Sequence, residues 1–455
     1  MPRQPLHDHK TEQQHKKQGN MVKVMKEALA VCSDKSLSAG VTVWDIDSGD
    51  HLLHIPTCAS PLHGLLCLAN HSIVASQVQR LGSFAGGAIF IWPLNKGYGV
   101  GAPANSHGIS ETKPQSVLRN YCLEAIGPIS STRDGLYLAG GAPSGNAFIW
   151  EVSSGRMVKK WSAHQRSISC LAFSMDGSLL VSGSNEGEIC VWDLISLLEV
   201  AADCGSVPSS FLSRLEHGSS ITGLICTSGS SSSMLVSSSL DGTCKVWDLF
   251  SGELLSVRAF PQPVNAIIID HKEQFLFSGC TDGRIFVSAV DSGVLDVNAS
   301  VASEDQLMVL SKHKGSITAL SFSLSGQFLI SASEDCTACL WDVKTWSVTR
   351  RFNHKKGQIT NIVTVPQSSL IAGGETSSRA SHQPRVSLLD KYPQPVNNFK
   401  GTVAVLPSSL ADNDIKTDFR SASMTSRQIL DLETGKKKKQ KVSSSSVPAS
   451  PPPEK

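Results

Sequence analysis

The sequence lacks the features that would tie a protein to a membrane or to bulk electrostatic binding. No run of about 18 apolar residues occurs in the 455-residue chain, so we expect no transmembrane helix and no membrane partner. The first twenty residues are polar and rich in His, Lys and Gln, whereas a secretory signal needs an apolar core. The 41 basic and 39 acidic residues nearly balance, and the resulting net charge of +2 provides no general attraction to nucleic acid.

Motifs that would indicate catalysis are also missing. The chain contains no GxxxxGK[ST] phosphate loop, no HExxH metal motif and no nucleophile elbow. The glycine-rich stretch GGAPSG (140–145) resembles a phosphate-binding turn, but no helix pattern follows it to hold an anion. We therefore predict that the protein is not an enzyme and requires no cofactor.

The twelve cysteines show no spacing that builds a metal centre or a disulfide framework. Most lie in apolar, strand-like runs, which indicates buried free thiols in a reducing compartment. Cys336 and Cys339 form a CxxC pair, but a structural zinc site needs four ligands and no second pair lies nearby. His7, His9 and His15 could hold an ion, although a His-rich chain end is usually incidental. No metal site is predicted.

What the sequence does contain is a repeated tryptophan. Six of the eight tryptophans end similar short apolar runs, which read VTVWDI, IFIWPL, AFIWEV, ICVWDL, CKVWDL and ACLWDV. A seventh run, Ile285-Phe286-Val287, has Ser288 where the tryptophan would stand. The six tryptophans are Trp44, Trp92, Trp150, Trp192, Trp247 and Trp341.

The text upstream of these runs repeats as well. SISCLAFSMDGSLLVSGS (167–184) aligns with SITALSFSLSGQFLISAS (316–333), and each reads as a strand, a tight turn and a second strand. The repeated positions lie between 41 residues apart, from Trp247 to Ser288, and 58 residues apart, from Trp92 to Trp150. The shorter spacings match the WD-repeat period of roughly 40–45 residues, which builds one four-stranded propeller blade per repeat. We predict an all-β, seven-bladed propeller.

Over about residues 27–375 the chain resembles the WD-repeat family, in which His, Ser or Thr, Asp and Trp of one blade form a hydrogen-bonded tetrad. A buried indole N–H and a buried imidazole need partners, and the Ser and Asp side chains supply them. Three sets stand at nearly constant spacing in this sequence, one of them with Glu at the Asp position. The sets are His164, Ser182, Glu186 and Trp192; His217, Ser237, Asp241 and Trp247; and His313, Ser331, Asp335 and Trp341.

The Trp150 repeat departs from this pattern, with Gly140 and Ser144 at the Ser and Asp positions, so we expect no tetrad there. Because the tetrad side chains are predicted to lie buried between strands, their Ser and His residues are interpreted as structural and not as a hydrolase triad.

One irregularity bears on how the ring closes. Trp44 has no upstream first strand of its own, whereas His354 and GQITNIVTV (357–365) begin a repeat that no tryptophan completes. We expect residues 358–365 to pair beside 27–32 and 41–45 and so close a seven-membered ring, which removes exposed sheet edges. An eighth blade built from residues 385–390 is the rival arrangement. Truncation at residue 355 should abolish soluble folded protein if the first arrangement is right, and leave a lower-melting ring if it is wrong.

The propeller is expected to span residues 22–400 between two tails. Residues 1–21 read as a disordered extension, and Met21 is a candidate start. The Gly-, Pro- and Ser-rich residues 97–115 read as a flexible loop between blades. Residues 401–455 leave the repeat pattern and are expected to be mostly disordered.

The C-terminal tail carries a basic cluster at 436–441, which has two interpretations. It is either a solvated tail or a nuclear-localisation signal, and nonspecific contact with RNA phosphates would use the same charges. The cluster consists of Lys436, Lys437, Lys438, Lys439 and Lys441.

A closer resemblance concerns function. The segments ALAVCSD…VTVWDIDSGDHLL, AIGPISSTRDGLYLAGG…IWEVSSGRM and SSLDGTCKVWDLFSGELL are similar to those of the WD-repeat protein 18 family, whose plant members are called root initiation defective. The resemblance implies a non-enzymatic scaffold of a nuclear Rix-type complex, located in nucleoplasm and nucleolus. Such a complex matures pre-60S particles, supports processing of internal transcribed spacer rRNA, contains helical-repeat subunits and recruits the AAA ATPase midasin.

Two other binding functions remain as alternatives. Substrate receptors of cullin-type ubiquitin ligases often carry Trp-Asp-x-Arg after a blade strand, but here Trp341-Asp342-Val343 is followed by Lys344. A signalling propeller of the G-protein β type needs an N-terminal heptad helix, which the residues before Met21 do not supply.

Overall fold

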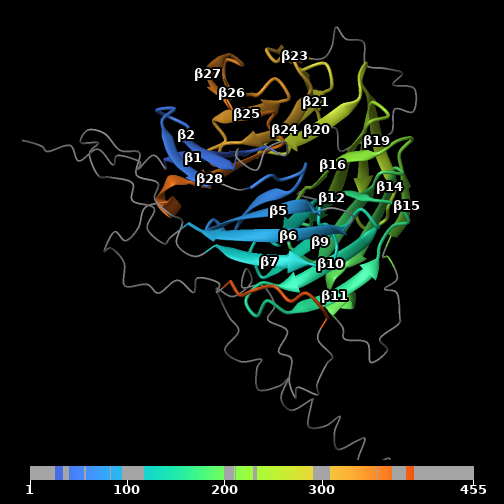
Figure 1. The fold of residues 1–455 in the computed structure, drawn as a ribbon. Coiled ribbons are helices and arrows are strands. Elements are labelled where there is room, and N and C mark those ends of the chain that lie inside the picture. Colours follow the sequence, from blue (N-terminus) through green and yellow to red (C-terminus); the bar gives the residue numbers. More distant parts are fainter. Residues whose placement is uncertain are drawn as a thin grey trace, which may run out of the picture. The chain divides into compact units, whose positions relative to one another are not determined.

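The structure is a computed structural model, and Figure 1 shows its fold. The residues that it describes are 26–33, 40–55, 58–81, 84–94, 117–198, 210, 212–228, 233–290, 308–355, 357–370 and 386–393. The predicted loop 97–115, His7, His9, His15 and the lysine cluster lie outside these residues. The chain divides into two units, Met1–Val396 and Asn397–Lys455, and all described residues belong to the first.

The described residues form 28 strands and two short helices. The first half of the strands is β1 (Glu27–Cys32), β2 (Val41–Asp45), β3 (His51–Ile55), β4 (Leu65–Leu68), β5 (Ser72–Leu81), β6 (Phe84–Pro93), β7 (Leu118–Cys122), β8 (Ile129–Ser131), β9 (Tyr137–Gly141), β10 (Asn146–Glu151), β11 (Met157–Ser162), β12 (Ile168–Phe173), β13 (Leu179–Ser184) and β14 (Glu188–Asp193). The second half is β15 (Leu212–Glu216), β16 (Ile221–Cys226), β17 (Met234–Ser239), β18 (Thr243–Asp248), β19 (Leu254–Ala259), β20 (Val264–Ile269), β21 (Phe275–Cys280), β22 (Arg284–Ala289), β23 (Met308–Ser311), β24 (Ile317–Phe322), β25 (Phe328–Ser333), β26 (Thr337–Asp342), β27 (Val348–Asn353) and β28 (Asn361–Pro366). The helices are α1 (Leu194–Leu198) and the 3-10 turn η2 (Gln367–Leu370).

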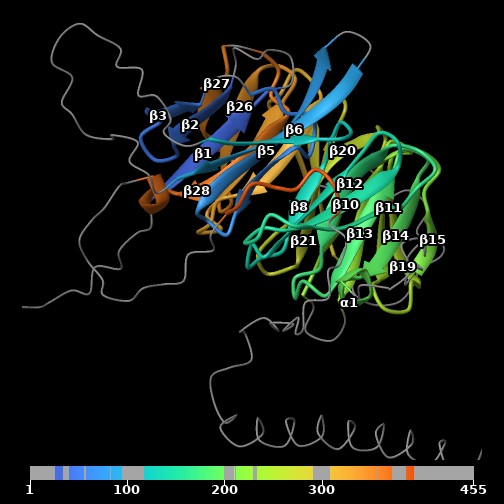
Figure 2. The same ribbon diagram turned by 60° about the horizontal axis from the view of Figure 1, so that its bottom comes forward.

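The strands build seven antiparallel sheets of four strands each. Six sheets use consecutive strands, from β4–β7 through β24–β27, and the seventh has the order β28-β1-β2-β3. The innermost strands β4, β8, β12, β16, β20, β24 and β28 contact one another in succession, and β28 contacts β4 to complete the circle. Figure 2 shows these sheets from a second direction. The prediction of a seven-bladed propeller is confirmed.

The ring is closed by pairing between the two ends of the propeller. Strand β28 pairs antiparallel with β1 from Glu27 opposite Pro366 to Cys32 opposite Asn361, and in Figure 1 orange β28 lies beside blue β1. The hydroxyl of Thr360 donates to the backbone carbonyl of Ser60, in the connection that leads from β3 to β4 of the next sheet. Closure by the C-terminal strand is thus confirmed.

The rival eighth blade is not formed. Residues 386–390 are described but belong to no strand or sheet, and Arg385 lies outside the described residues. This segment instead lies against the sheet of β8–β11, as described below.

The core lies between neighbouring sheets. Alternate residues of each strand face opposite sheet surfaces, so every sheet contributes to two adjoining apolar layers. In one layer Phe277 of β21 and Trp341 of β26 are both almost fully buried. This stacking of one sheet on the next explains why the strands read as nearly continuous apolar runs. Among the described residues, no helix has the length and apolar character needed to cross a bilayer.

Candidate functional site

The sheet β16–β19 contains a continuous chain of buried polar contacts. Trp247 Nε1 donates to Ser237 Oγ at 2.9 Å, and Ser237 Oγ lies 2.8 Å from His217 Nε2. The other ring nitrogen, His217 Nδ1, lies 3.0 Å from Asp241 Oδ2. Ser237 is fully buried and His217 nearly so. The four side chains predicted for this repeat are therefore in mutual contact.

One arrangement of protons satisfies every group in this chain. An ionised carboxylate only accepts, so His217 Nδ1 carries the proton that faces Asp241. Its Nε2 then accepts the hydroxyl proton of Ser237, whose oxygen accepts the indole N–H. Burial lowers the pKa of His217, and nearby Asp241 only partly opposes that effect, so the neutral imidazole is favoured.

The sheet β24–β27 repeats this arrangement. Trp341 Nε1 donates to Ser331 Oγ at 2.8 Å, and His313 Nε2 lies 2.7 Å from the same oxygen. His313 Nδ1 lies 3.2 Å from Asp335 Oδ2. Burial lowers the pKa of His313 here as well. The second predicted set is also brought together.

The third set requires a correction. Trp192 Nε1 donates to Ser182 Oγ at 2.9 Å, and His164 Nε2 lies 2.7 Å from that oxygen, as in the other two sheets. The carboxylate at His164 Nδ1 belongs to Glu188, at 3.4 Å, and not to the predicted Glu186. Glu186 lies in the exposed turn and accepts from Arg166 Nε at 3.0 Å. Glu188 stands at the position of Thr243, beside the histidine, and its longer side chain reaches the imidazole.

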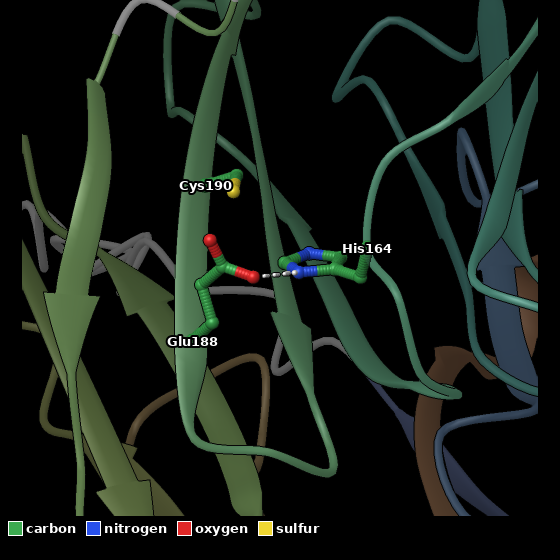
Figure 3. A group of neighbouring side chains, drawn as sticks. All are labelled: His164, Glu188 and Cys190. Atoms are coloured by element: carbon green, nitrogen blue, oxygen red, sulfur yellow. Dashed lines mark hydrogen bonds and ion pairs between the residues drawn. The ribbon is translucent and has the colours of Figure 1, made fainter.

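This substitution creates a group of three potential metal ligands. His164 Nδ1, a Glu188 carboxylate oxygen and Cys190 Sγ all lie within 4.8 Å of one another (Figure 3). Burial and the neighbouring Glu188 raise the pKa of Cys190 to about 12, which disfavours the thiolate form in the metal-free protein. Because His164 is held by Ser182 and Glu188, these contacts fit a modified tetrad better than an ion site.

Strand register explains why only three sheets have a tetrad. In each of them the serine lies two residues after the partner of the tryptophan in the neighbouring strand, as Ser237 follows Leu235, which pairs with Trp247. The corresponding positions in the sheets of Trp44, Trp92 and Trp150 are Val31, Ala75 and Gly140. These residues have no side-chain acceptor for an indole N–H.

The Trp150 sheet obtains its acceptor from a distant segment. Trp150 Nε1 donates to the backbone carbonyl oxygen of Asp390 at 3.0 Å, across 240 residues of sequence. A serine would not fit in the place of Gly140, because a Cβ atom there would lie 2.8 Å from Ile126 and 3.2 Å from the Trp150 ring. The sequence of residues 385–390 indicates only a candidate strand and carries no sign of this contact with Trp150.

Further contacts fasten residues 386–390 to the sheet. Asn120 Oδ1 accepts the backbone N–H of Leu389 at 2.7 Å, and the Asp390 N–H donates to Gly155 O at 2.7 Å. Leu389 is buried in the apolar layer around Trp150, whereas Leu388 is 61% exposed. Figure 1 shows this red segment running beside β7 and β11.

Trp44 and His354, the residues predicted at the ring closure, are also neighbours. Their ring centroids are 6.2 Å apart in an edge-to-face arrangement. The ring centroid of Phe352, a residue of β27, lies 5.8 Å from that of Trp44. Trp44 therefore packs against the last blade of the ring by aromatic contact.

The three tetrad sheets are also those that sequence comparison recognises. The profile of the "WD domain, G-beta repeat" family matches residues 155–193, 209–248 and 304–342, which end at the strands of Trp192, Trp247 and Trp341. The chain is 33% identical over 418 residues to Protein ROOT INITIATION DEFECTIVE 3 of Arabidopsis thaliana, covering 89% of this chain and 88% of that protein. The chain belongs to this WD-repeat family.

Other members of the family are similar over shorter stretches. WD repeat-containing protein 18 of Homo sapiens is 30% identical over 346 residues, which is 75% of this chain and 74% of that protein. Pre-rRNA-processing protein IPI3 of Yarrowia lipolytica is 30% identical over 251 residues, 53% of this chain and 58% of that protein. The resemblance inferred from the repeated segments is thus confirmed.

Cys336 and Cys339, the CxxC pair of the sequence, do not form a cluster of metal ligands. Cys336 occupies a turn with φ of 67°, the place where Gly242 has φ of 79°, and Cys339 is buried in β26. Both are free thiols, like the other described cysteines. Burial raises the pKa of Cys339, with Arg351 opposing it.

Proposed function

We propose that the protein is a non-enzymatic scaffold subunit of a nuclear complex that matures the large ribosomal subunit and processes internal transcribed spacer rRNA. Family membership carries this proposal, because the related protein of Yarrowia lipolytica is named for pre-rRNA processing. The partners are helical-repeat subunits of a Rix-type complex, midasin and pre-60S particles, and RNA is contacted indirectly, through these partners.

The architecture supports a binding function. Seven sheets in a closed ring hold their connecting turns on a rigid frame, so several surfaces can be presented to different partners at once. The Ser and His residues that resemble catalytic groups are instead used in the core. Ser237, for example, is fully buried and already bonded to Trp247 and His217.

The nuclear location, in nucleoplasm and nucleolus, follows from the same family argument. The cluster at 436–441 supplies a candidate import signal, although it lies outside the described residues. Fusing this cluster to a large cytosolic reporter tests that assignment, and a reporter that remains cytosolic would contradict it.

Affinity purification of the tagged full-length chain from cells of its source tests the proposal. We expect recovery of helical-repeat proteins, a midasin-type ATPase and large-subunit precursors. Depletion of the protein should cause spacer-containing rRNA precursors to accumulate, as measured by hybridisation to the spacer. A chain truncated at residue 355 lacks the closing strand β28 and is expected to give no soluble folded protein, so it serves as the negative control.

Two results would contradict the proposal. One is recovery of a cullin adaptor in place of ribosomal precursors, which would indicate the ubiquitin-ligase alternative. The other is a normal level of spacer-containing precursors after depletion.

A further inference from the structure

A pocket of about 1100 Å³ lies between the sheets β20–β23 and β24–β27, at the ends of β22 and β26. The sheet β20–β23 is the one whose repeat has Ser288 in place of tryptophan. The pocket is as large as those that enclose drug-sized ligands. Its rim includes two exposed apolar side chains, Phe275 and Met308, with 44% and 40% of their surface accessible.

Aromatic rings form one wall of the pocket. The ring centroid of Phe277 lies 5.4 Å from that of Phe322 and 5.4 Å from that of Trp346. His271 meets the edge of Phe322 at 5.7 Å. Phe277 and Phe322 are almost fully buried and form the base of the wall, so the half-buried ring of Trp346, held in place by them, offers the contact surface to an apolar side chain.

Trp346 is held in a conformation that its side chain disfavours. It has φ of 54°, and the equivalent turn positions of other sheets are the glycines Gly49, Gly155 and Gly252, with φ of 81°, 77° and 74°. A left-handed conformation costs a non-glycine residue about 1 kcal/mol or more. Backbone strain of this kind is concentrated at functional sites, and here it places an indole in the wall of the pocket.

The charged groups around the pocket favour an acidic ligand. Arg258, Lys272 and Lys344 line it together with two carboxylates, Asp270 and Asp342. Asp270 Oδ1 accepts the backbone N–H groups of Gln274 and Phe275, both at 2.7 Å. Asp342 Oδ1 likewise accepts the N–H of Lys344 at 2.9 Å. The three basic side chains outnumber the two carboxylates, and the two lysines are exposed whereas Asp270 and Asp342 are half-buried, so the rim has a net positive charge.

We propose that this pocket, walled by Phe277, Phe322 and Trp346, docks an acidic segment of a partner protein that inserts one large apolar side chain. The aromatic wall would bind the apolar anchor, and Lys272 and Lys344 would attract the flanking carboxylates. The inference rests on the proposed scaffold function and assigns one docking surface to it.

The test uses the purified full-length chain and a panel of labelled eight-residue peptides. Each peptide has one Phe, Trp or Leu flanked by Asp and Glu. Matched panels replace the flanks by Lys and Arg, or the central residue by Ala. We expect fluorescence anisotropy to show binding of the acidic apolar panel at least tenfold tighter than of either matched panel, weakening with added salt.

Two variants of the chain locate the binding. Trp346→Gly restores the residue that equivalent turns use, so the turn is kept while the indole is removed; we expect at least a tenfold loss of affinity. The pair Lys272→Glu and Lys344→Glu should cause a similar loss. The pair Lys312→Glu and Lys314→Glu changes the net charge equally at exposed positions outside the pocket lining, and should leave affinity within twofold.

Thermal unfolding of each variant shows whether it is folded. If Trp346→Gly does not fold, the affinities of the Lys272/Lys344 pair and of the Lys312/Lys314 control pair decide whether the pocket binds the peptide. Equal affinity of the folded variants and the unmodified chain would overturn the proposal, as would absence of binding to any panel.

Residues 291–307 are acidic and connect β22 to β23 in the sequence, where Ala289 and Met308 line the pocket, so they are the competing occupant. A variant with Asp291, Asp296, Glu304 and Asp305 changed to Asn or Gln tests this. Peptide binding by that variant alone would overturn the proposal. Peptide binding is measured on the isolated chain. A normal level of spacer-containing rRNA precursors after depletion would therefore contradict the proposed ribosomal function but not the docking of a peptide in this pocket.

Discussion

The sheets β16–β19 and β8–β11 bury the same group, a tryptophan indole N–H, in two different ways. In the first sheet the acceptor is Ser237 Oγ, ten residues before Trp247. In the second it is the carbonyl oxygen of Asp390, 240 residues after Trp150. Both tryptophans are nearly fully buried, so an acceptor is needed in each case.

The difference lies in the space beside the indole ring. In the first sheet that space accommodates the Ser237 side chain, which also contacts His217. In the second sheet a Cβ atom at Gly140 would lie too close to the Trp150 ring. Stacking of Phe148 on Trp150, with centroids 5.6 Å apart, takes the place of the imidazole contact. A repeat can therefore lose its tetrad and keep its fold when another part of the chain supplies the missing acceptor.

The largest expected effect comes from breaking the local network. Ser237→Ala leaves the Trp247 indole and the His217 imidazole buried without their shared partner, which should lower the free energy of unfolding by about 2–4 kcal/mol. Chemical denaturation measures this change. The matched control is Ser278→Ala, since this buried serine is in the equivalent position of a sheet without tryptophan. An equal loss in both variants would contradict the role given to the tetrad.

Breaking the long-range contact should have a smaller effect. Leu389→Ala removes the buried anchor of residues 386–390 and should cost about 1–2 kcal/mol, because detachment of the segment limits the loss. Leu388→Ala, at the exposed neighbouring position, is the control and should be neutral. Hydrogen exchange should accelerate in β9 and β10 of the Leu389 variant. Unchanged protection there would show that the segment does not hold the Trp150 sheet.

The smallest expected effect is a difference in pH sensitivity. Burial lowers the pKa of His217 and of His313 in the folded protein, so the unfolded chain binds protons first as pH falls below the ordinary value of about 6.5. Their stabilising contribution is therefore fully present above that pH and decreases below it. Hydrogen-exchange protection factors of β17 should fall between pH 7.5 and 5.5, and those of β10 should fall less. An equal fall in both strands would contradict this contrast.

Much of the fold and part of the site could be predicted from local sequence. The spacing of Ser, Asp and Trp in the repeats of Trp247 and Trp341 follows directly from strand register, so the side chains meet wherever the hairpin forms. The carboxylate of the Trp192 repeat was misassigned because alignment places Glu186 at the Asp position. Side-chain reach favours Glu188 instead, and alignment by position does not report reach.

The pocket beside Trp346 could not be predicted, although the sequence held a signal. A tryptophan at a turn position occupied by glycine in other repeats marks a strained residue. Its proximity to Phe277 and Lys272 depends on how two sheets pack, and no local sequence pattern encodes that packing.

The sequence by itself determined seven repeats, their strand patterns, three Ser–His–Trp networks and the pairing that closes the ring. Those features depend on contacts within one hairpin or on a repeat completed by its missing half. Only the tertiary structure decided that the Asp390 carbonyl serves Trp150, and that Phe277, Phe322 and Trp346 share one wall. Such contacts join segments far apart in the chain, and their geometry is set by the packing of sheets, which leaves no periodic trace in the sequence.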